Sequence, residues 1–322
     1  MKKIALFTSG GDSPGMNACI RAVVRTALYK GVEVYGIRYG YEGMISGDFY
    51  KMDAKSVAHI IHRGGTILKT SRSKKFLTAE GMQKAKEQLE KFEIEGVIAI
   101  GGDGTFRGAA EISKICNVHF VGCPGTIDND LVGTDYTIGY DTAINTVVEA
   151  VDKIRDTAES HNRVFIVEVM GRDSGLIALF SGIGAGAEGV LIPETKYDLE
   201  GLLKSLGEKQ REKHSRIIIV AEGHETVGAF IVDKAIKEKF PQFDTRVSVL
   251  GHIQRGGSPS CMERVNASRM GFAAVETLLE GKAQVMVGII NNKIVLTPFA
   301  DAVKQLIEPD AVLLKMVDIL AR

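Results

Sequence analysis

Short apolar runs alternate with helical patterns along almost the whole chain of 322 residues. Alternation of this kind produces parallel sheets flanked by helices, so it restricts the fold to the α/β class. The apolar runs expected to form strands lie at 4–7, 32–37, 97–100, 119–121, 164–169, 189–192, 217–221 and 247–250. The segments with helical spacing lie at 16–29, 82–92, 142–157, 199–212 and 266–279. In such a fold ligands gather at the carboxyl ends of the strands.

The length of the chain predicts two domains, because 322 residues are many for a single hydrophobic core. No low-complexity linker marks a boundary between them. The best candidate is 136–141, after which a long helical segment begins, and the next is 249–257, which is rich in glycine and basic residues. Two boundaries without linkers predict two domains that exchange chain segments.

Composition excludes several classes of partner. Apolar residues make up 45% of the chain, charged residues make up 25%, and the formal net charge is zero. These values are ordinary for a globular protein and give no overall attraction to nucleic acid or to a membrane surface. No stretch approaches the roughly 20 apolar residues of a membrane span. The N-terminal apolar run is also too short for the core of a signal peptide.

The four cysteines, Cys19, Cys116, Cys123 and Cys261, are scattered and form no CxxC pair. Their spacing argues against a zinc site and against a disulfide framework. Reduced, buried thiols in a cytosolic protein are expected instead.

Three glycine turns follow three of the expected strands. They are 9–12 (SGGD), 101–105 (GGDGT) and 124–130 (PGTIDND). Glycine lets a backbone approach a ligand closely, so the turns predict phosphate binding, with plain turns as the alternative. Neither of the first two fits the GxxxxGK[ST] loop or the GxGxxG fingerprint, which excludes those two nucleotide-binding classes.

Acidic residues in these turns suit phosphoryl transfer, which needs a cation and an acceptor for the proton of the attacking hydroxyl. Asp103 lies in an open turn, and its oxygen ligands suit Mg²⁺. Asp128 and Asp130 are two apart and would share one side of an extended segment. One would accept the proton and the other would support it or the metal. A solvated loop or a helix N-cap is the alternative for this pair.

Basic residues near other strand ends favour an anionic ligand. Arg163 and Arg246 precede expected strands, Arg172 follows one, and His252 and Arg255 lie in the turn after another. The planar guanidinium of arginine binds two phosphate oxygens at once. Solvated surface charge is the alternative for each arginine taken alone.

Five motifs in this order resemble the bacterial ATP-dependent 6-phosphofructokinases. They are TSGGD at 8–12, GGDGT at 101–105, PGTIDND at 124–130, EVMGR at 168–172 and GHIQRGGSP at 251–259. GGDGT alone is a weak sign, because related lipid and NAD kinases carry a similar turn. PGTIDND and GHIQRGGSP separate the family from those kinases, and the resemblance runs nearly end to end.

The resemblance implies two interlocking α/β domains, each a mainly parallel sheet flanked by helices. Residues 1–139 with about 252–305 would bind ATP, and 140–251 with about 306–322 would bind fructose 6-phosphate. The implied reaction moves the γ-phosphoryl group of ATP to the 1-hydroxyl of fructose 6-phosphate, with Mg²⁺ as cofactor. The products are fructose 1,6-bisphosphate and ADP, in the committed step of glycolysis. The family's usual form is a cytoplasmic homotetramer whose sites are shared between chains.

Carried over by motif, Asp128 would take the proton from the sugar hydroxyl and Asp130 would assist. Thr126 and Arg172 would stabilise charge on the transferring group, and Asp103 would hold Mg²⁺. The residues implied at ATP are Gly11, through its backbone N–H, and Tyr41, Arg72, Ser73, Gly102, Asp103, Gly104, Thr105 and Gly108. Those implied at the sugar phosphate are Thr126, Ile127, Asp128, Met170, Gly171, Arg172, Glu222, His252 and Arg255, with Arg163 and Arg246 from a neighbouring chain.

Two glycines favour ATP as the phosphoryl donor. Relatives that use pyrophosphate typically carry Asp where Gly104 stands and Lys where Gly125 stands. An Asp there would repel the α-phosphate of ATP, and a Lys would hold pyrophosphate. A pyrophosphate-dependent enzyme is therefore one alternative, and a non-catalytic sensor of sugar phosphate or nucleotide is another. The joint presence of Asp103, Asp128 and Arg172 argues against the sensor.

The chain departs from the family pattern at the nucleotide and at a second, regulatory site. Ser73 stands where an aromatic residue is common, and Leu77 where a basic one is common. Nucleoside diphosphate (ADP) and phosphoenolpyruvate are the family's usual effectors, and matching residues are Arg21, Arg25, Arg155, Gly186, Glu188, Arg211 and Lys213. Ala54 and His59 replace a common basic residue and a common Asp. This predicts altered or weakened allostery, which His59 would make pH-dependent.

Overall fold

The computed structural model describes residues 1–161, 163–208, 216–223, 228–305 and 308–320. The chain divides into two compact units. Unit 1 comprises 1–142 and 255–305, and unit 2 comprises 143–254 and 306–322. The chain therefore leaves unit 1 within one helix, α5 (Tyr140–His161), and returns to it at Arg255. Which ligand each unit binds remains a prediction.

Unit 1 is built on a mainly parallel sheet whose described strands follow the order β12-β11-β5-β4-β1-β2-β3, with β6 paired to β5. Among the described strands of this sheet, the edge strands β3 and β12 are the ones that run antiparallel to their neighbours. The strands are β1 (Lys3–Thr8), β2 (Glu33–Ile37), β3 (Phe49–Met52), β4 (Gly96–Gly101), β5 (His119–Thr126), β6 (Ile138–Gly139), β11 (Val285–Ile290) and β12 (Lys293–Pro298).

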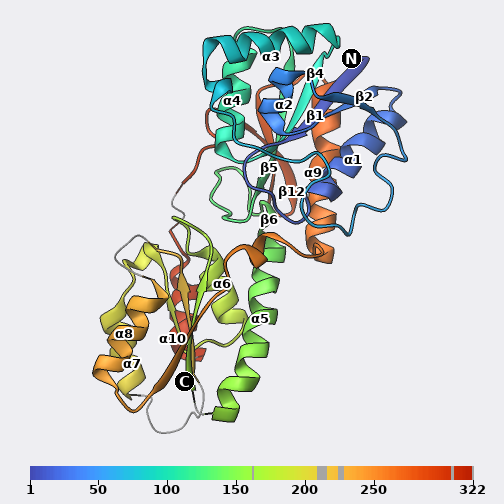
Figure 1. Cartoon of the computed structure of the whole chain (residues 1–322). Coiled ribbons are helices and arrows are strands. Elements are labelled where there is room, and N and C mark those ends of the chain that lie inside the picture. Colours follow the sequence, from blue (N-terminus) through green and yellow to red (C-terminus); the bar gives the residue numbers. More distant parts are fainter. Residues whose placement is uncertain (162, 209–215, 224–227, 306–307, 321–322) are drawn as a thin grey trace. The chain divides into compact units, whose positions relative to one another are not determined.

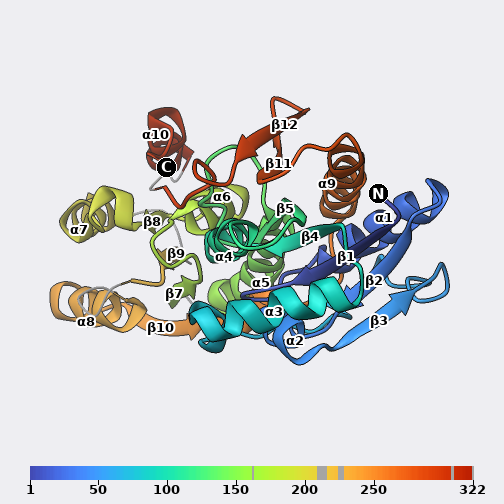
Figure 2. The same cartoon turned by 90° about the horizontal axis from the view of Figure 1, so that it is seen from above.

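Helices cover both faces of this sheet, which explains why its central strands are continuously apolar. In β1, Ile4 and Leu6 point to one face, and Ala5 and Phe7 point to the other. The first face packs against α1 (Met16–Tyr29) and α9 (Cys261–Leu279), which lie side by side (Figure 1). The second face packs against α2 (Gly40–Ser46), α3 (Ala79–Lys91) and α4 (Asp103–Ser113) (Figure 2).

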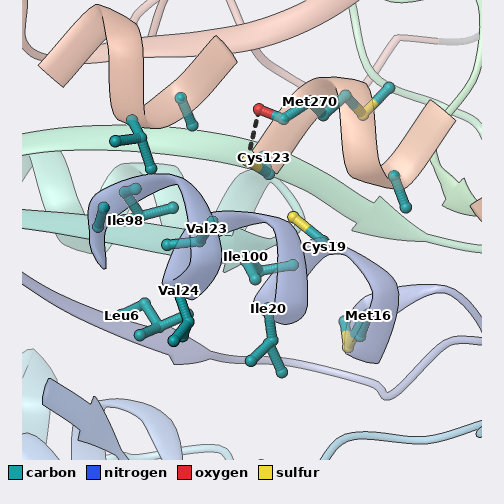
Figure 3. Packing of buried hydrophobic residues seen from close by; sticks show 14 of the residues in the cluster. Leu6, Met16, Cys19, Ile20, Val23, Val24, Ile98, Ile100, Cys123 and Met270 are labelled. Carbon is teal, nitrogen blue, oxygen red and sulfur yellow. Dashed lines mark hydrogen bonds between the residues drawn. The ribbon is translucent and has the colours of Figure 1, made fainter. Parts of the chain in front are cut away.

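Two cysteines lie inside the first of these layers (Figure 3). Cys19 on α1 and Cys123 on β5 are fully buried, and the Cys123 thiol donates to the carbonyl of Met270 at 3.8 Å. A hydrogen bond with Cys123 and burial together raise the pKa of the Cys19 thiol. All four cysteines are free, but Cys116 is half-buried and Cys261 is exposed. The expectation that all four are buried was therefore wrong.

Unit 2 carries a parallel sheet in the order β10-β7-β9-β8. These strands are β7 (Arg163–Val169), β8 (Gly189–Leu191), β9 (Arg216–Ala221) and β10 (Asp244–Val249). One face packs on α7 (Leu199–Glu208) and α8 (Ala229–Lys239), which Figure 1 shows together beside the sheet. On the other side lie α6 (Leu176–Gly184) and, in contact with it, α10 (Ala311–Leu320).

The predicted α/β class with mainly parallel sheets is confirmed. The expected strand at 247–250 was misplaced, because β10 begins at Asp244 and ends at Val249, so Arg246 lies inside it. Part of the expected helix at 199–212 falls outside the described residues. The structure also contains the short 3₁₀ helices η1 (Lys75–Leu77), η2 (Pro193–Thr195) and η3 (Gly251–Arg255).

Candidate active site

Three neighbouring strands of unit 1 end at the same edge of the sheet. β1, β4 and β5 are adjacent and parallel, with Thr8 opposite Ile100 and Gly101 opposite Pro124. The turn after β1 is tied to β4 by a hydrogen bond from the Ser9 N–H to the Ile100 carbonyl at 3.0 Å. The three glycine turns found in the sequence therefore meet at one edge, where ligands of parallel sheets bind.

Asp103 is the first residue of α4 and does not lie in an open turn as expected. Its carboxylate pairs with Arg107 at 3.0 Å and is 22% exposed. Gly102 forms the N-cap of the helix, and a Cβ added at Gly104 would meet nothing within 4 Å. The start of α4 thus offers free backbone N–H groups, one carboxylate and open space, which suits a phosphate group with its Mg²⁺.

Tyr41, which was expected at ATP, packs against the start of α4. Its ring is buried and stacks on Phe76 with centroids 3.9 Å apart. The hydroxyl donates to the Thr105 carbonyl at 2.5 Å, and a Cβ on Gly108 would lie 2.9 Å from the ring. Tyr41 and Gly108 therefore position α4, and a contact of either residue with ATP stays a prediction.

Ser73 also has a local role. Its hydroxyl donates to Glu42 at 2.6 Å and accepts from the Phe76 N–H at 3.1 Å. These bonds fix the start of η1, so the small hydroxyl residue caps a turn at the position where the family often has an aromatic ring. Arg72 beside it is exposed, as a phosphate ligand at a surface site would be.

The segment after β5 is not extended, which corrects the expectation that Asp128 and Asp130 share one side. Residues 127 and 128 form a bend, and Asn129 has a left-handed backbone with φ of 50°. Asp128 is 3% exposed and its N–H donates to the Thr126 hydroxyl at 3.2 Å. Asn129 holds the bend by donating to the Asp135 carbonyl and accepting from the Thr137 N–H.

Sequence reasoning missed Lys304, which holds Asp130. The ammonium lies 2.6 Å from the Asp130 carboxylate, whose side chain is 7% exposed. Backbone bonds from Gln305 to Asp130 and from Val132 to Val303 join the two segments further. Lys304 is more than 170 residues away along the chain and belongs to no motif, so only the fold reveals the contact.

Replacing Lys304 by methionine is expected to lower turnover about tenfold, because the segment bearing Asp128 loses an anchor. The free energy of unfolding should fall by about 1 kcal/mol, since Lys304 is 36% exposed and solvent screens part of the pair. Steady-state kinetics and thermal denaturation measure both. Lys293→Met, at the exposed start of β12, is the matched control. Equal kinetics in the two variants would contradict this role.

Arg255 reaches the first glycine turn. Its Nη1 donates to the Asp12 carbonyl at 3.3 Å, and a Cβ built on Gly11 would lie 2.4 Å from the same atom. Both residues belong to unit 1. A side chain at position 11 would displace this guanidinium, so glycine here keeps a backbone N–H and an arginine together.

In unit 2 the EVMGR motif forms a tight turn at the carboxyl end of β7. Gly171 and Arg172 both have positive φ, of 144° and 52°. The Glu222 carboxylate accepts from both of their N–H groups, at 3.3 and 2.9 Å. The Met170 N–H donates to the side-chain carbonyl of Gln254 at 3.2 Å. Gln254 is fully buried, and nothing in the sequence indicated this role. Glu222 thus fixes the turn, and Arg172 is exposed at its tip.

Arg163 and Arg246 lie elsewhere on the same sheet. Arg163 opens β7 and is opposite Asp244, the first residue of β10. The carboxylate of Asp244 pairs with both arginines, at 2.8 Å in the case of Arg163. Arg163 is therefore separated from Arg172 by the length of β7, roughly 20 Å at about 3.3 Å per residue. Within one chain the structure does not bring these arginines to the EVMGR turn.

The residues expected at the regulatory site fall in both units. Arg21 and Arg25 share a face of α1, and burial together with the charge of Arg25 lowers the pKa of Arg21. In unit 2, Arg155 donates to the carbonyls of Ala185 and Gly186. Glu188 is buried and accepts from the Ile217 N–H at 2.6 Å. Arg211 and Lys213 lie outside the described residues.

Among the described residues, no three His, Cys, Asp or Glu side chains gather as a protein-only metal centre would require. Magnesium bound chiefly by substrate phosphates needs only one or two carboxylates, so Asp103 alone fits that ion. No helix in the described part of the chain is long and apolar enough to cross a membrane.

Comparisons with known proteins find similarity to phosphofructokinases along the chain. The family model described as phosphofructokinase matches residues 3–278. The ATP-dependent 6-phosphofructokinase 1 of Thermus thermophilus is 54% identical over 322 residues and 100% of both chains. The ATP-dependent 6-phosphofructokinase of Cytophaga hutchinsonii is 56% identical over 304 residues, covering 94% of this chain and 93% of its own.

Solved structures agree as well. The phosphofructokinase of Pichia pastoris in the T-state has a TM-score of 0.88 at 35% identity and covers 94% of this chain. This chain spans 35% of the Pichia chain. A pyrophosphate-dependent phosphofructokinase of Nitrosospira multiformis, at 20% identity and a TM-score of 0.86, has the same fold. This chain belongs to the phosphofructokinase family.

Proposed function

We propose that this protein is an ATP-dependent 6-phosphofructokinase, which transfers the γ-phosphoryl group of ATP to the 1-hydroxyl of fructose 6-phosphate. The observation that carries the proposal is the match over the full length, at 54% identity, to a relative of that name. The products are fructose 1,6-bisphosphate and ADP, and the enzyme acts in the cytoplasm.

The nucleotide binds to unit 1. The N–H of Gly11, the start of α4 and the exposed Arg72 surround its phosphates. Asp103 would hold Mg²⁺, which when bound would neutralise charge on the phosphate oxygens. Arg107 pairs with the Asp103 carboxylate at 3.0 Å, so this ion pair would have to open for Asp103 to bind the ion.

Phosphoryl transfer has a loose transition state, so positioning and charge stabilisation matter more than a strong base. Asp128 accepts the proton of the sugar hydroxyl, and its burial strengthens every interaction made there. The Thr126 hydroxyl and the Arg172 guanidinium stabilise the charge on the transferring group. Asp130 supports the bend that carries Asp128 through its ion pair with Lys304.

The sugar phosphate binds to Met170, Gly171, Arg172, Glu222 and His252, and Arg255 is a further residue proposed for its phosphate group. Arg163 and Arg246 serve the site of a neighbouring chain in a homotetramer. Arg163 lies at the start of β7 and Arg246 is opposite Phe165, so both lie away from the EVMGR turn at the other end of that strand, which supports this assignment. ADP and phosphoenolpyruvate are the expected effectors, with a response altered by Ala54 and His59.

A coupled assay for fructose 1,6-bisphosphate tests the function directly. Product is expected with Mg²⁺ and ATP, and none with pyrophosphate in place of ATP. Product with pyrophosphate alone would favour the pyrophosphate-dependent alternative. Binding of fructose 6-phosphate without product from either donor would favour a sensor.

Replacing Gly104 by aspartate is expected to raise KM for ATP by at least about tenfold, since a carboxylate beside the phosphates repels them. The fold should tolerate the change, because the added side chain meets open space and an acidic residue suits the first turn of α4. Gly104→Ala fills the same space without charge and should keep KM within about twofold. The idea fails if alanine and aspartate raise KM equally.

A further inference from the structure

The first turn of α9 holds a buried acid that the mechanism above does not use. Glu263 is 3% exposed, and its N–H is capped by the Ser260 hydroxyl at 3.0 Å. Burial, with a smaller contribution from the charge of Asp141, raises the pKa of this carboxyl to about 7, although hydrogen bonds from the backbone of Gly139 and Thr142 act to lower it. A buried carboxyl of this kind titrates near neutral pH.

Three segments of unit 1 meet at this carboxyl. Oε2 accepts from the N–H and from the hydroxyl of Thr142, each at 3.3 Å, at the start of α5. The Gly139 N–H, in β6, is a further backbone donor. On the third side lies Gly15, just before α1, where a Cβ would come within 2.8 Å of Cγ of Glu263. Only glycine at position 15 leaves room for the acid.

The partners of Glu263 lead directly to the residues proposed to act on substrate. Gly139 is opposite Thr126 in the β5–β6 pair. The Thr137 hydroxyl donates to the Thr126 carbonyl at 2.6 Å, and the Thr137 N–H donates to Asn129 at 2.7 Å. The segment 137–139 thus supports the bend that carries Asp128 through these hydrogen bonds.

The glycine turn after β1 is hydrogen-bonded to the same segment, 137–139. The Ser13 hydroxyl donates to the Ile138 carbonyl at 2.7 Å. Gly139 has φ of 113°, and a Cβ there would lie 2.4 Å from Cβ of Ser13. A shift of β6 would therefore move the turn proposed to bind ATP phosphates together with the bend that carries Asp128.

We propose that ionised Glu263 is a positioning residue for the proposed phosphoryl transfer, which clamps β6 and the start of α5 and so fixes Thr126 and Asp128. The inference rests on the proposed function. Among the described residues, the hydrogen-bonding partners of this carboxylate are donors: two backbone N–H groups and the Thr142 hydroxyl, which itself accepts from the Ser260 N–H at 3.2 Å. Protonation of Glu263 replaces its charge-assisted hydrogen bonds by weaker neutral ones, so β6 and the start of α5 are held less firmly.

The surroundings of Glu263 leave it as the group that titrates. Asp141 on α5 is the charged neighbour, and its carboxylate accepts from the Ser260 hydroxyl. Tyr140 is buried, and burial raises the pKa of its hydroxyl far above the working range. Arg264 on α9 donates to the Pro259 carbonyl and to the Ser258 hydroxyl. Gly15 and the two residues of β6 bring no ionisable side chain.

The test compares kcat of the wild type with that of Glu263→Gln from pH 6 to pH 8. If the protonated form keeps about one-tenth of the activity, the wild-type to variant ratio should rise from about twofold at pH 6 to about tenfold at pH 8. Dividing the wild-type kcat by the variant kcat at each pH cancels the effect of any other group that titrates in both proteins. Glu276→Gln, the same change at the Lys30 ion pair on the same helix, should give a ratio near one throughout. A constant ratio for Glu263→Gln would overturn the proposal.

Two further measurements keep the outcome decisive. Glu263→Asp retains the charge on a shorter side chain, so it should lower kcat but keep the pH dependence that glutamine abolishes. Thermal midpoints need no activity: the native state binds the Glu263 proton between about pH 4.5 and 7 and the unfolded state does not, so wild-type stability falls across this range as pH rises. The glutamine variant lacks this loss, and its midpoint relative to wild type should rise from pH 5 to pH 8. An inactive wild type would instead refute the proposed function.

Discussion

Replacing Asp128 by asparagine is expected to lower kcat by about 10³-fold while KM for fructose 6-phosphate changes by no more than about threefold. A positioned general base contributes about 10²–10⁴-fold to a rate, and asparagine cannot accept the proton. The amide fills nearly the same volume at this buried position, so the bend after β5 and the sugar site should persist. Steady-state kinetics with the coupled assay separates the two parameters.

Asp301→Asn is the matched control for Asp128→Asn, since it makes the same substitution at an exposed aspartate of unit 1. It should leave kcat and KM unchanged. Near-normal turnover in Asp128→Asn would show that another group takes the proton. A large rise in KM with unchanged kcat would make Asp128 a binding residue.

Removal of the Arg172 guanidinium is the second change with a large expected effect, about 10²–10³-fold in kcat. A cation aimed at charge that develops in the transition state stabilises that state more than bound substrate. Asparagine is the most informative replacement, because it tolerates the left-handed backbone that Arg172 adopts with φ of 52°. The EVMGR turn held by Glu222 should therefore remain folded.

Lys196→Asn controls for both the lost charge and the backbone, because Lys196 is an exposed basic residue of unit 2 with φ of 51°. The comparison uses kcat and the thermal midpoint of each variant. Similar kinetics in the two variants would remove Arg172 from the reaction. A lower midpoint in Arg172→Asn alone would instead assign it a structural role.

The sequence predicted the fold class because strand and helix periods are local. The helix at 16–29 matches α1 residue for residue, and the apolar runs at 97–100 and 217–221 lie within β4 and β9. The three glycine turns were predicted to gather at one edge, and β1, β4 and β5 bring them together. That expectation needed only the rule for parallel strands, and no knowledge of tertiary contacts.

The remaining errors have a common physical origin in contacts between distant segments. Spacing predicted that Asp128 and Asp130 share a side, but Asn129 turns the chain and Lys304 holds Asp130 from another segment. Glu263 follows Ser260 as an ordinary helix cap, and nothing in its spacing indicates that Gly15 and Thr142 bury it.

The order in which the chain is synthesised is at odds with the order in which unit 1 can be completed. The face of its sheet covered by α1, which begins at Met16, stays open until α9 emerges from Cys261 onward. β11 and β12, which extend the sheet beyond β5, come later still. The described strands of unit 2, from Arg163 to Val249, are made in the interval. A nascent chain therefore exposes the apolar residues Cys19, Ile20 and Val23 for most of its synthesis. If the ribosome stalls before α9 is made, the N-terminal half of the chain is the part prone to aggregate.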